Sequence, residues 1–215
     1  KILVHEKANI ILTGATSTGK TTMLNILSGF IPRDERIITI EDTVELNLEI
    51  ENVVRLESKP PNIEGKGEIS IRDLVRNSMR MRPDRIIVGE VRGSEIIDVL
   101  QAMNTGHKGS MTTVHANSCQ DLISRLETML MIAGSNISTR TARKIILSSV
   151  EIIIFLERLK TGERVISEVC KVMGRTNDNM ELSEIDLKSI CTFDKKKHQT
   201  KKFHIKDCFN FCGDF

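Results

Sequence analysis

The stretch from Gly14 to Thr22, GATSTGKTT, combines small, hydroxyl-bearing and basic residues at a spacing that suits phosphate binding. Gly14, Gly19, Lys20 and Thr21 occupy the four fixed places of the pattern G-x-x-x-x-G-K-[ST]. In this pattern, backbone N–H groups surround the β-phosphate of a nucleotide, the lysine reaches the β- and γ-phosphates, and the threonine hydroxyl binds Mg²⁺. The sequence therefore predicts a nucleoside triphosphate site, and a glycine-rich turn that binds nothing is the alternative.

We expect the whole loop to contribute to nucleotide binding. Its residues are Gly14, Ala15, Thr16, Ser17, Thr18, Gly19, Lys20, Thr21 and Thr22. A short apolar run, residues 10–12, precedes the loop, and apolar residues at helical spacing follow it between Met23 and Leu27. This order predicts a strand, a loop and a helix, which is the context that a working phosphate loop requires.

Carboxylates follow two further apolar segments that read as strands. Residues 36–40 (RIITI) lead into Glu41, Asp42 and Glu45, and residues 84–90 (DRIIVGE) end on Glu90. Ligands of a parallel sheet bind at the carboxyl ends of its strands. We therefore expect Glu90 to hold Mg²⁺ or activate the attacking water, and Glu41 to orient that water. A cap or turn is the alternative for the first group, and a surface pair with Arg92 is the alternative for Glu90.

Other charged residues fit more than one role. His115 ends a predicted strand at residues 109–115, where it could contact the γ-phosphate or be an ordinary polar residue. Arginines spaced four apart on a predicted helix share one face, which could be solvated or salt-bridged, or could reach the nucleotide of a neighbouring subunit. These arginines are Arg72, Arg76 and Arg80, and Arg55 and Arg82 are the other candidates for such a role.

The remaining pattern alternates strands with helices. Ser70 is placed to cap a helix that runs from Ile71 to about Met81. Further helices are predicted at 94–103, 120–132 and 138–150, and further strands at 53–56, 152–156 and 164–172, the last two joined by a turn. The C-terminal forty or so residues are polar and we expect them to be irregular. The order predicts an α/β fold with a largely parallel sheet flanked by helices.

Composition narrows the possible functions. The 215 residues are 40% hydrophobic and 28% charged, which is typical of a globular chain, and no apolar run is long enough to span a bilayer. A net charge of +2 and an aromatic content of 3% disfavour nucleic acid as a partner. The scattered cysteines, Cys119, Cys170, Cys191, Cys208 and Cys212, show no spacing that completes a zinc site. We expect reduced thiols in a cytosolic protein.

Three segments add a family resemblance. RIITIEDTVEL at 36–46, DRIIVGEVRG at 84–93 and GHKGSMTTVHANS at 106–118 resemble the Asp box, the atypical Walker B and the His box of secretion ATPases. This superfamily drives type II secretion, type IV pili and type IV secretion. VVRLESKPPNIEGKGEISIRDLVRNSMRMRPDRIIVGEVRG, LQAMNTGHKGSMTTVHANS and SRLETMLMIAG further resemble the CpaF-type ATPase of tight-adherence (Flp) pili. The resemblance covers about residues 9–173.

The resemblance implies a RecA-like P-loop NTPase motor domain at 1–173, followed by a polar, Lys-rich extension at 174–215. It implies a homo-hexameric ring at the cytoplasmic face of the membrane that uses ATP and Mg²⁺ and acts on polytopic platform proteins. By position, the catalytic roles fall on Glu41, Glu90 and His115, and the Mg²⁺ ligands on Thr21 and Glu90. Family members carry an N-terminal domain that this sequence does not show, so a C-terminal fragment is expected.

Two departures from the family pattern stand out. Ala15 and Ser17 occupy loop positions where the family often has glycine, so backbone strain there could weaken binding. The chain after Met173 does not resemble the family's usual ending, and its lysines could touch anionic lipid or simply be solvated. The predicted function is Mg²⁺-dependent ATP hydrolysis that powers pilus assembly or related type II/IV secretion. A type IV secretion ATPase that exports protein or DNA, and a nucleotide-binding module without useful turnover, are the alternatives.

Overall fold

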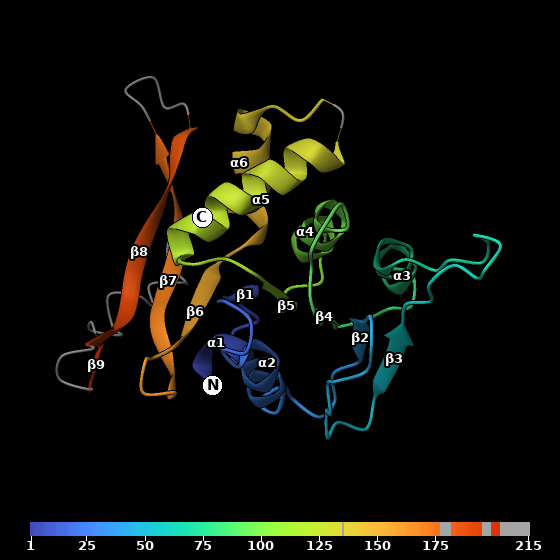
Figure 1. The fold of residues 1–215 in the computed structure, drawn as a ribbon, viewed down its shortest axis with the longest axis horizontal. Helices are drawn as coiled ribbons and strands as arrows, with labels where there is room; N and C mark the ends of the chain where they lie inside the picture. The colour runs from blue at the N-terminus through green and yellow to red at the C-terminus, as the bar shows by residue number, and fades with distance from the viewer. Residues whose placement is uncertain (135, 177–181, 195–198, 203–215) are drawn as a thin grey trace.

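The computed structural model describes residues 1–134, 136–176, 182–194 and 199–202, and in this part of the chain nine strands form one sheet (Figure 1). The strand order is β3-β2-β4-β5-β1-β6-β7-β8-β9. The strands are β1 Ile10–Thr13, β2 Ile37–Glu41, β3 Val53–Glu57, β4 Arg85–Val88, β5 Met111–Val114, β6 Ile152–Arg158, β7 Arg164–Thr176, β8 Leu182–Asp194 and β9 Gln199–Lys202. The helices are α1 Ile2–His5, α2 Lys20–Ser28, α3 Ile71–Ser78, α4 Ile96–Asn104, α5 Cys119–Ala133 and α6 Thr139–Ser149.

The sheet has two halves of different character. The strands from β3 to β6 all pair in parallel, whereas β6, β7, β8 and β9 pair antiparallel. Parallel neighbours need a crossover connection, and helices fill this role between most of the first six strands. The predicted α/β fold with a largely parallel sheet is therefore confirmed, and the hairpin between 152–156 and 164–172 is also confirmed.

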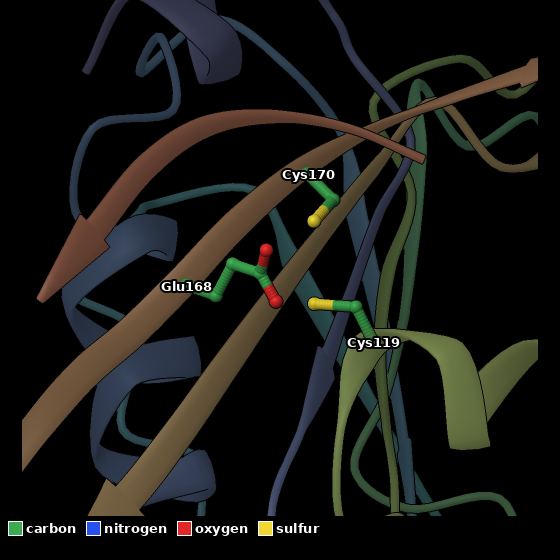
Figure 2. A group of neighbouring side chains, drawn as sticks. All are labelled: Cys119, Glu168 and Cys170. Atoms are coloured by element: carbon green, nitrogen blue, oxygen red, sulfur yellow. The ribbon is translucent and has the colours of Figure 1, made fainter. Parts of the chain in front are cut away.

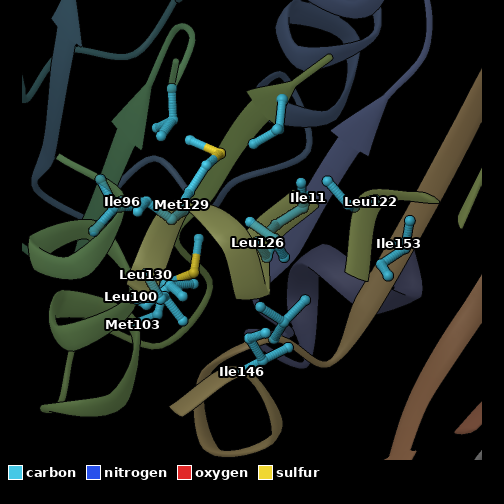
Figure 3. Close-up of a cluster of buried hydrophobic side chains, with 14 of the residues drawn as sticks. Ile11, Ile96, Leu100, Met103, Leu122, Leu126, Met129, Leu130, Ile146 and Ile153 are labelled. Carbon is cyan, nitrogen blue, oxygen red and sulfur yellow. The ribbon is translucent and has the colours of Figure 1, made fainter. Parts of the chain in front are cut away.

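Helices cover both faces of the parallel half. Alternate strand residues point to opposite faces, so each face has its own apolar core. Figure 3 shows the larger core, where Ile11 of β1 and Ile153 of β6 lie beside Leu126 of α5 and Ile146 of α6. α3 and α4 pack into the same core, while α1 and α2 cover the other face through Val4 and Leu24. The loop that follows β1 is thus attached to a strand that is buried on both sides.

The end of α3 differs from the prediction, although its start does not. The Ser70 side chain accepts a hydrogen bond from the backbone N of Asp73 at 3.2 Å, and the Asp73 side chain accepts one from the backbone N of Ser70, also at 3.2 Å. This capping box confirms the predicted cap. The helix ends at Ser78, because the backbone N–H groups of Arg80 and Met81 bond three residues back in a tighter turn. The predicted end near Met81 is therefore three residues too late.

The C-terminal segment is more regular than expected. β7 continues to Thr176, and β8 pairs with it along residues 182–192. Ile185 of β8 is buried in the larger core. The expectation of an irregular segment is wrong for residues 182–194, since regular pairing with β7 satisfies their backbone groups. The proposed boundary at 173/174 falls within β7, and Lys195 to Lys197 of the basic cluster lie outside the described residues.

Candidate functional site

The phosphate-loop motif lies between β1 and α2, which confirms the predicted strand–loop–helix order. Gly14 has φ 151°, and a Cβ atom there would lie 2.3 Å from the carbonyl O of Leu156. No side chain fits that gap, so glycine is required for the loop to lie against β6. Ser17 has φ 62°, which places it in the left-handed region that glycine favours, whereas Ala15 does not have a positive φ. The backbone strain expected at both positions is therefore present at Ser17 alone.

Lys20 is the first residue of α2 and reaches back across the loop. Its Nζ donates hydrogen bonds to the carbonyl oxygens of Gly14 at 3.1 Å and Ala15 at 2.9 Å. Burial lowers the pKa of Lys20, and the nearby Glu90 carboxylate opposes this shift. The ammonium group is thus held at the mouth of the loop, beside the positive end of a helix.

The loop and the carboxyl ends of β2, β4 and β5 surround one cavity of about 910 Å³. This volume lies within the range of small-molecule sites in proteins. Most of the predicted site residues line it, namely Thr16, Ser17, Gly19, Lys20, Thr21, Thr22, Glu41, Glu90 and His115. Gly14, Ala15 and Thr18 do not line the cavity, and Thr18 instead donates its Oγ1 proton to the Ala15 carbonyl at 2.9 Å. These three residues shape the loop from within.

Glu41 ends β2 and is almost fully buried at the edge of the cavity. Its Oε1 accepts hydrogen bonds from the backbone N of Glu45 and of Leu46, both at 3.0 Å. Gly89 makes this position possible, because a Cβ there would lie 3.0 Å from Cγ of Glu41. Burial raises the pKa of Glu41 even though the two N–H groups oppose the shift. The predicted cluster therefore contains both a turn-stabilising contact and a carboxylate that binds a proton more readily than usual.

Glu90 follows β4 and lies close to two other side chains. Its Oε2 lies 2.6 Å from Nη2 of Arg92, and its Oε1 lies 2.7 Å from Nε2 of His115. Burial raises the pKa of Glu90, but the hydrogen bond from Arg92 and the charges of Arg92 and Lys20 outweigh it and hold the pKa below its usual value. Glu90 is therefore ionised at neutral pH. The pair with Arg92, which is the alternative for Glu90, involves one of the two carboxylate oxygens, Oε2.

The contact between His115 and Glu90 is not an ion pair. Burial and the charge of Lys20 lower the pKa of His115, so its ring is neutral at pH 7. Oε1 of Glu90 is buried and accepts no hydrogen bond of good geometry in the described part of the chain. A buried carboxylate oxygen without such a partner is available to a cation or a water molecule. With the Thr21 hydroxyl on the same cavity, the residues present fit an Mg²⁺ ion.

Two of the arginines that share one face of α3 form salt bridges. Nε of Arg72 and Nε of Arg76 lie 2.6 and 2.8 Å from the two carboxylate oxygens of Asp98, which is buried on α4. These contacts favour the salt-bridged alternative for both arginines. Among the other candidates, Arg55 donates to the Leu48 carbonyl at 3.1 Å. None of the five arginines considered from the sequence lines the cavity.

Two cavity arginines were missed by sequence reasoning. Arg125 lies on α5, inside a stretch quoted for the family resemblance. Arg164 begins β7, and its Nε donates to the carbonyl O of Ser17 in the phosphate loop at 3.1 Å. No local pattern marks Arg164, because its position depends on how β7 pairs with β6.

Comparison with known proteins gives concordant results. The family described as "Type II/IV secretion system protein" matches residues 1–206. The type IV secretion system protein PtlH of Bordetella pertussis is 38% identical over 161 residues, which are 74% of this chain and 48% of PtlH. The crystal structure of the VirB11 ATPase from the Brucella suis type IV secretion system, in complex with sulphate, superposes with TM-score 0.72 and 32% identity over 79% of this chain and 50% of VirB11.

A pilus motor has a similar fold. The pilus retraction motor PilT with bound ADP superposes with TM-score 0.60 and 27% identity over 78% of this chain and 49% of PilT. These neighbours confirm the predicted RecA-like α/β core. The chain spans about half the length of PtlH, VirB11 and PilT. Among the described residues, no helix combines the length and the apolar character needed to cross a membrane.

Proposed function

This chain belongs to the Type II/IV secretion system protein family, and we propose that it binds and hydrolyses ATP with Mg²⁺ as part of a secretion or pilus motor. The observation that carries the proposal is one cavity lined by Lys20 and Thr21 of the phosphate loop together with Glu41, Glu90 and His115. These side chains come from segments that are far apart in the sequence. A loop that bound no nucleotide would not need carboxylates and a histidine gathered opposite it.

The phosphate loop and α2 would hold the triphosphate. Residues of the loop and the start of α2 line the cavity, where their backbone N–H groups would bind the phosphates, and Lys20 adds a positive charge there. Thr21 and Glu90 would hold Mg²⁺, directly or through water. When bound, the ion would neutralise negative charge on the phosphates that develops during transfer. Neutral His115 would act near the γ-phosphate as a hydrogen-bonding group, since its lowered pKa leaves it without charge at pH 7.

The two glutamates are suited to different tasks. Glu90 is ionised and paired with Arg92, so it fits a role as a cation ligand. Burial raises the pKa of Glu41 in the direction of pH 7. Glu41 therefore fits a role in which it positions the attacking water and accepts its proton. Environments that shift the pKa values of two carboxylates in opposite directions are typical of paired acid–base sites.

The finer assignment is pilus assembly of the tight-adherence type by a homo-hexameric ring at the cytoplasmic face of the membrane. It is supported by the resemblance of the segments at 53–93, 100–118 and 124–134, and the partners would be platform proteins of the inner membrane. On this proposal, residues 1–173 are the motor domain and 174–215 an extension. A type IV secretion ATPase that exports protein or DNA is the second candidate, favoured by the similarity to PtlH and VirB11.

The test is steady-state ATP hydrolysis measured against protein concentration, with Lys20→Ala as the blank. A cavity shared between subunits predicts turnover that rises more steeply than linearly with concentration and disappears in the variant. Tight nucleotide binding without turnover at any concentration would contradict the enzymatic proposal and leave a nucleotide-binding module. Deletion of the gene then separates the two motor assignments, because loss of pili supports the first and loss of effector or DNA transfer supports the second.

A further inference from the structure

Cys119, Glu168 and Cys170 form a compact cluster away from the nucleotide cavity (Figure 2). The two Sγ atoms and a carboxylate oxygen of Glu168 all lie within 4.8 Å of one another. Both cysteines are about 1% exposed, whereas Glu168 is half-buried. In Figure 2 the three side chains point toward one another, Cys119 from α5 and the other two from β7.

The cluster results from packing between distant segments. Cys119 is the first residue of α5, and Glu168 and Cys170 are two apart on β7, so both point to the sheet face that α5 covers. Pairing with β6 fixes this orientation, because Cys170 lies opposite Ile153 of the larger core. The sequence did not predict a metal site here, because Cys119 and Cys170 are far apart along the chain.

A fourth polar group lies beside the cluster. Ser189 of β8 is the register partner of Cys170. Its Oγ is buried and has no hydrogen-bond partner in the described part of the chain. A buried hydroxyl without a partner is costly, and such groups often mark the place of an ion or an ordered water.

We propose that Cys119, Cys170 and Glu168 bind a Zn²⁺ ion. Two thiolates and a carboxylate are ligands that zinc accepts in tetrahedral sites, and a mixed set of sulfur and oxygen donors is less suited to iron–sulfur clusters or to Mg²⁺. Three protein ligands leave one position, which a water molecule or the Ser189 hydroxyl would complete. Binding replaces two S–H bonds by two Zn–S bonds, and the two protons leave to solvent.

Cys170 is buried beside the carboxylate of Glu168. The hydrogen bond with Cys119, burial and the nearby Glu168 carboxylate raise the pKa of the Cys170 thiol. A divalent ion would compensate the negative charges that burial otherwise disfavours. Glu168 is half-buried, so this ligand remains partly in contact with solvent.

Zinc at this position would join the two halves of the molecule. Cys119 follows the segment that carries His115, and Glu168 and Cys170 belong to the antiparallel half. The ion would thus fasten the start of α5 to β7. None of the three ligands lines the nucleotide cavity, so the zinc proposal does not depend on the proposed ATPase activity.

The test uses the full chain, stripped of metal and kept reduced with a non-thiol reductant. We expect titration with Co²⁺ alone to reach one ion per chain and to give thiolate-to-cobalt charge-transfer absorption, and Zn²⁺ to displace the cobalt and raise the Tm. Cys119→Ser and Cys170→Ser should abolish the absorption. Glu168→Gln should weaken Zn²⁺ binding by about 10-fold or more.

Matched controls separate this site from other thiols. Cys191→Ser, and a double variant with Cys208→Ser and Cys212→Ser, should keep one cobalt ion with unchanged absorption. Circular dichroism checks the folding of each variant, and Glu168→Gln keeps the test decisive if a cysteine variant does not fold. The proposal is overturned if the reduced chain takes up no cobalt, or if Cys170→Ser or Glu168→Gln binds it as the natural chain does. A Cys119–Cys170 disulfide formed in air, by a chain that binds no metal when reduced, would instead identify a redox pair.

Discussion

The parallel and antiparallel halves of the sheet contribute to the molecule by different means. In the parallel half, Glu41, Glu90 and His115 each follow the carboxyl end of a strand, and the topology brings these ends together at one edge. In the antiparallel half, Arg164 and Cys170 reach their neighbours through strand pairing that includes an irregularity between Phe155 and Leu156. Convergence of parallel strand ends is therefore robust, whereas contacts across a hairpin depend on register.

The largest effect is expected from Glu90→Gln in the parallel half. The change keeps the volume of the side chain but removes the charge that would hold Mg²⁺, so kcat should fall by about 10³–10⁴-fold while nucleotide affinity stays nearly constant. Glu64→Gln, on an exposed loop, is the matched control and should keep full turnover. The test is to measure kcat and the nucleotide Kd of both variants. Weaker binding with turnover preserved would refute the role of Glu90.

A smaller loss is expected from Glu41→Gln, about 10²–10³-fold in kcat. Burial raises the pKa of Glu41, and its carboxylate becomes protonated as pH falls through that raised value. The kcat of the unsubstituted protein should therefore decline over this pH range. The variant should lose this acidic limb of the pH–rate profile. Asp42→Asn changes the next residue, whose Oδ1 accepts from Ser58 Oγ at 2.8 Å, and should cost less than about 10-fold. If the pH–rate profile of Glu41→Gln keeps its acidic limb, Glu41 is not the base.

A stability change is expected from Glu35→Gln, again in the parallel half. Arg85 is fully buried, and its Nε and Nη2 donate to the two Glu35 oxygens at 2.5 and 3.1 Å. Loss of this charge-assisted pair should reduce the free energy of unfolding by about 2–3 kcal/mol, measured by urea denaturation. Glu127→Gln, in the more exposed pair with Arg143, should cost about 1 kcal/mol or less.

The same pair predicts a pH dependence of stability. Burial raises the pKa of Glu35, but the hydrogen bond and charge of Arg85, with the charge of Lys7, outweigh it and hold the pKa below its usual value. The stabilisation is therefore present above the pKa of glutamate in the unfolded chain and is lost as pH falls through the lowered value in the folded chain. Glu35→Gln should flatten this acidic decline. An equally steep decline in the variant would assign it to other carboxylates.

The smallest effect tests the antiparallel half. Arg164→Ala removes the hydrogen bond to the Ser17 carbonyl and one positive charge from the cavity, so nucleotide affinity should fall by about 10-fold. Arg158 is the cross-strand partner of Arg164 and does not line the cavity, so Arg158→Ala should leave affinity unchanged. Isothermal titration with ADP measures both variants. Equal affinities would show that the antiparallel half does not take part in binding.

Much of the candidate site could be predicted because it is encoded in short segments. The phosphate loop, the cap at Ser70 and the carboxylates at Glu41 and Glu90 each depend on residues within a few positions of one another. The end of α3 and the strand at 182–194 were missed, since local tightening of a helix and pairing with β7 leave weak patterns in the sequence.

By itself the sequence determined the strand–loop–helix at Gly14, the α/β order and the family, because strand and helix periodicities and the phosphate loop are local properties of the chain. Three contacts are visible in the tertiary structure but not in the sequence. Arg72 and Arg76 share Asp98, Arg164 contacts the phosphate loop, and Cys119 lies next to Cys170. The tertiary structure also decided the opposite pKa shifts of Glu41 and Glu90, which follow from burial and neighbouring charge. Contacts between segments far apart in sequence depend on register and packing, and those emerge only when the whole sheet is assembled.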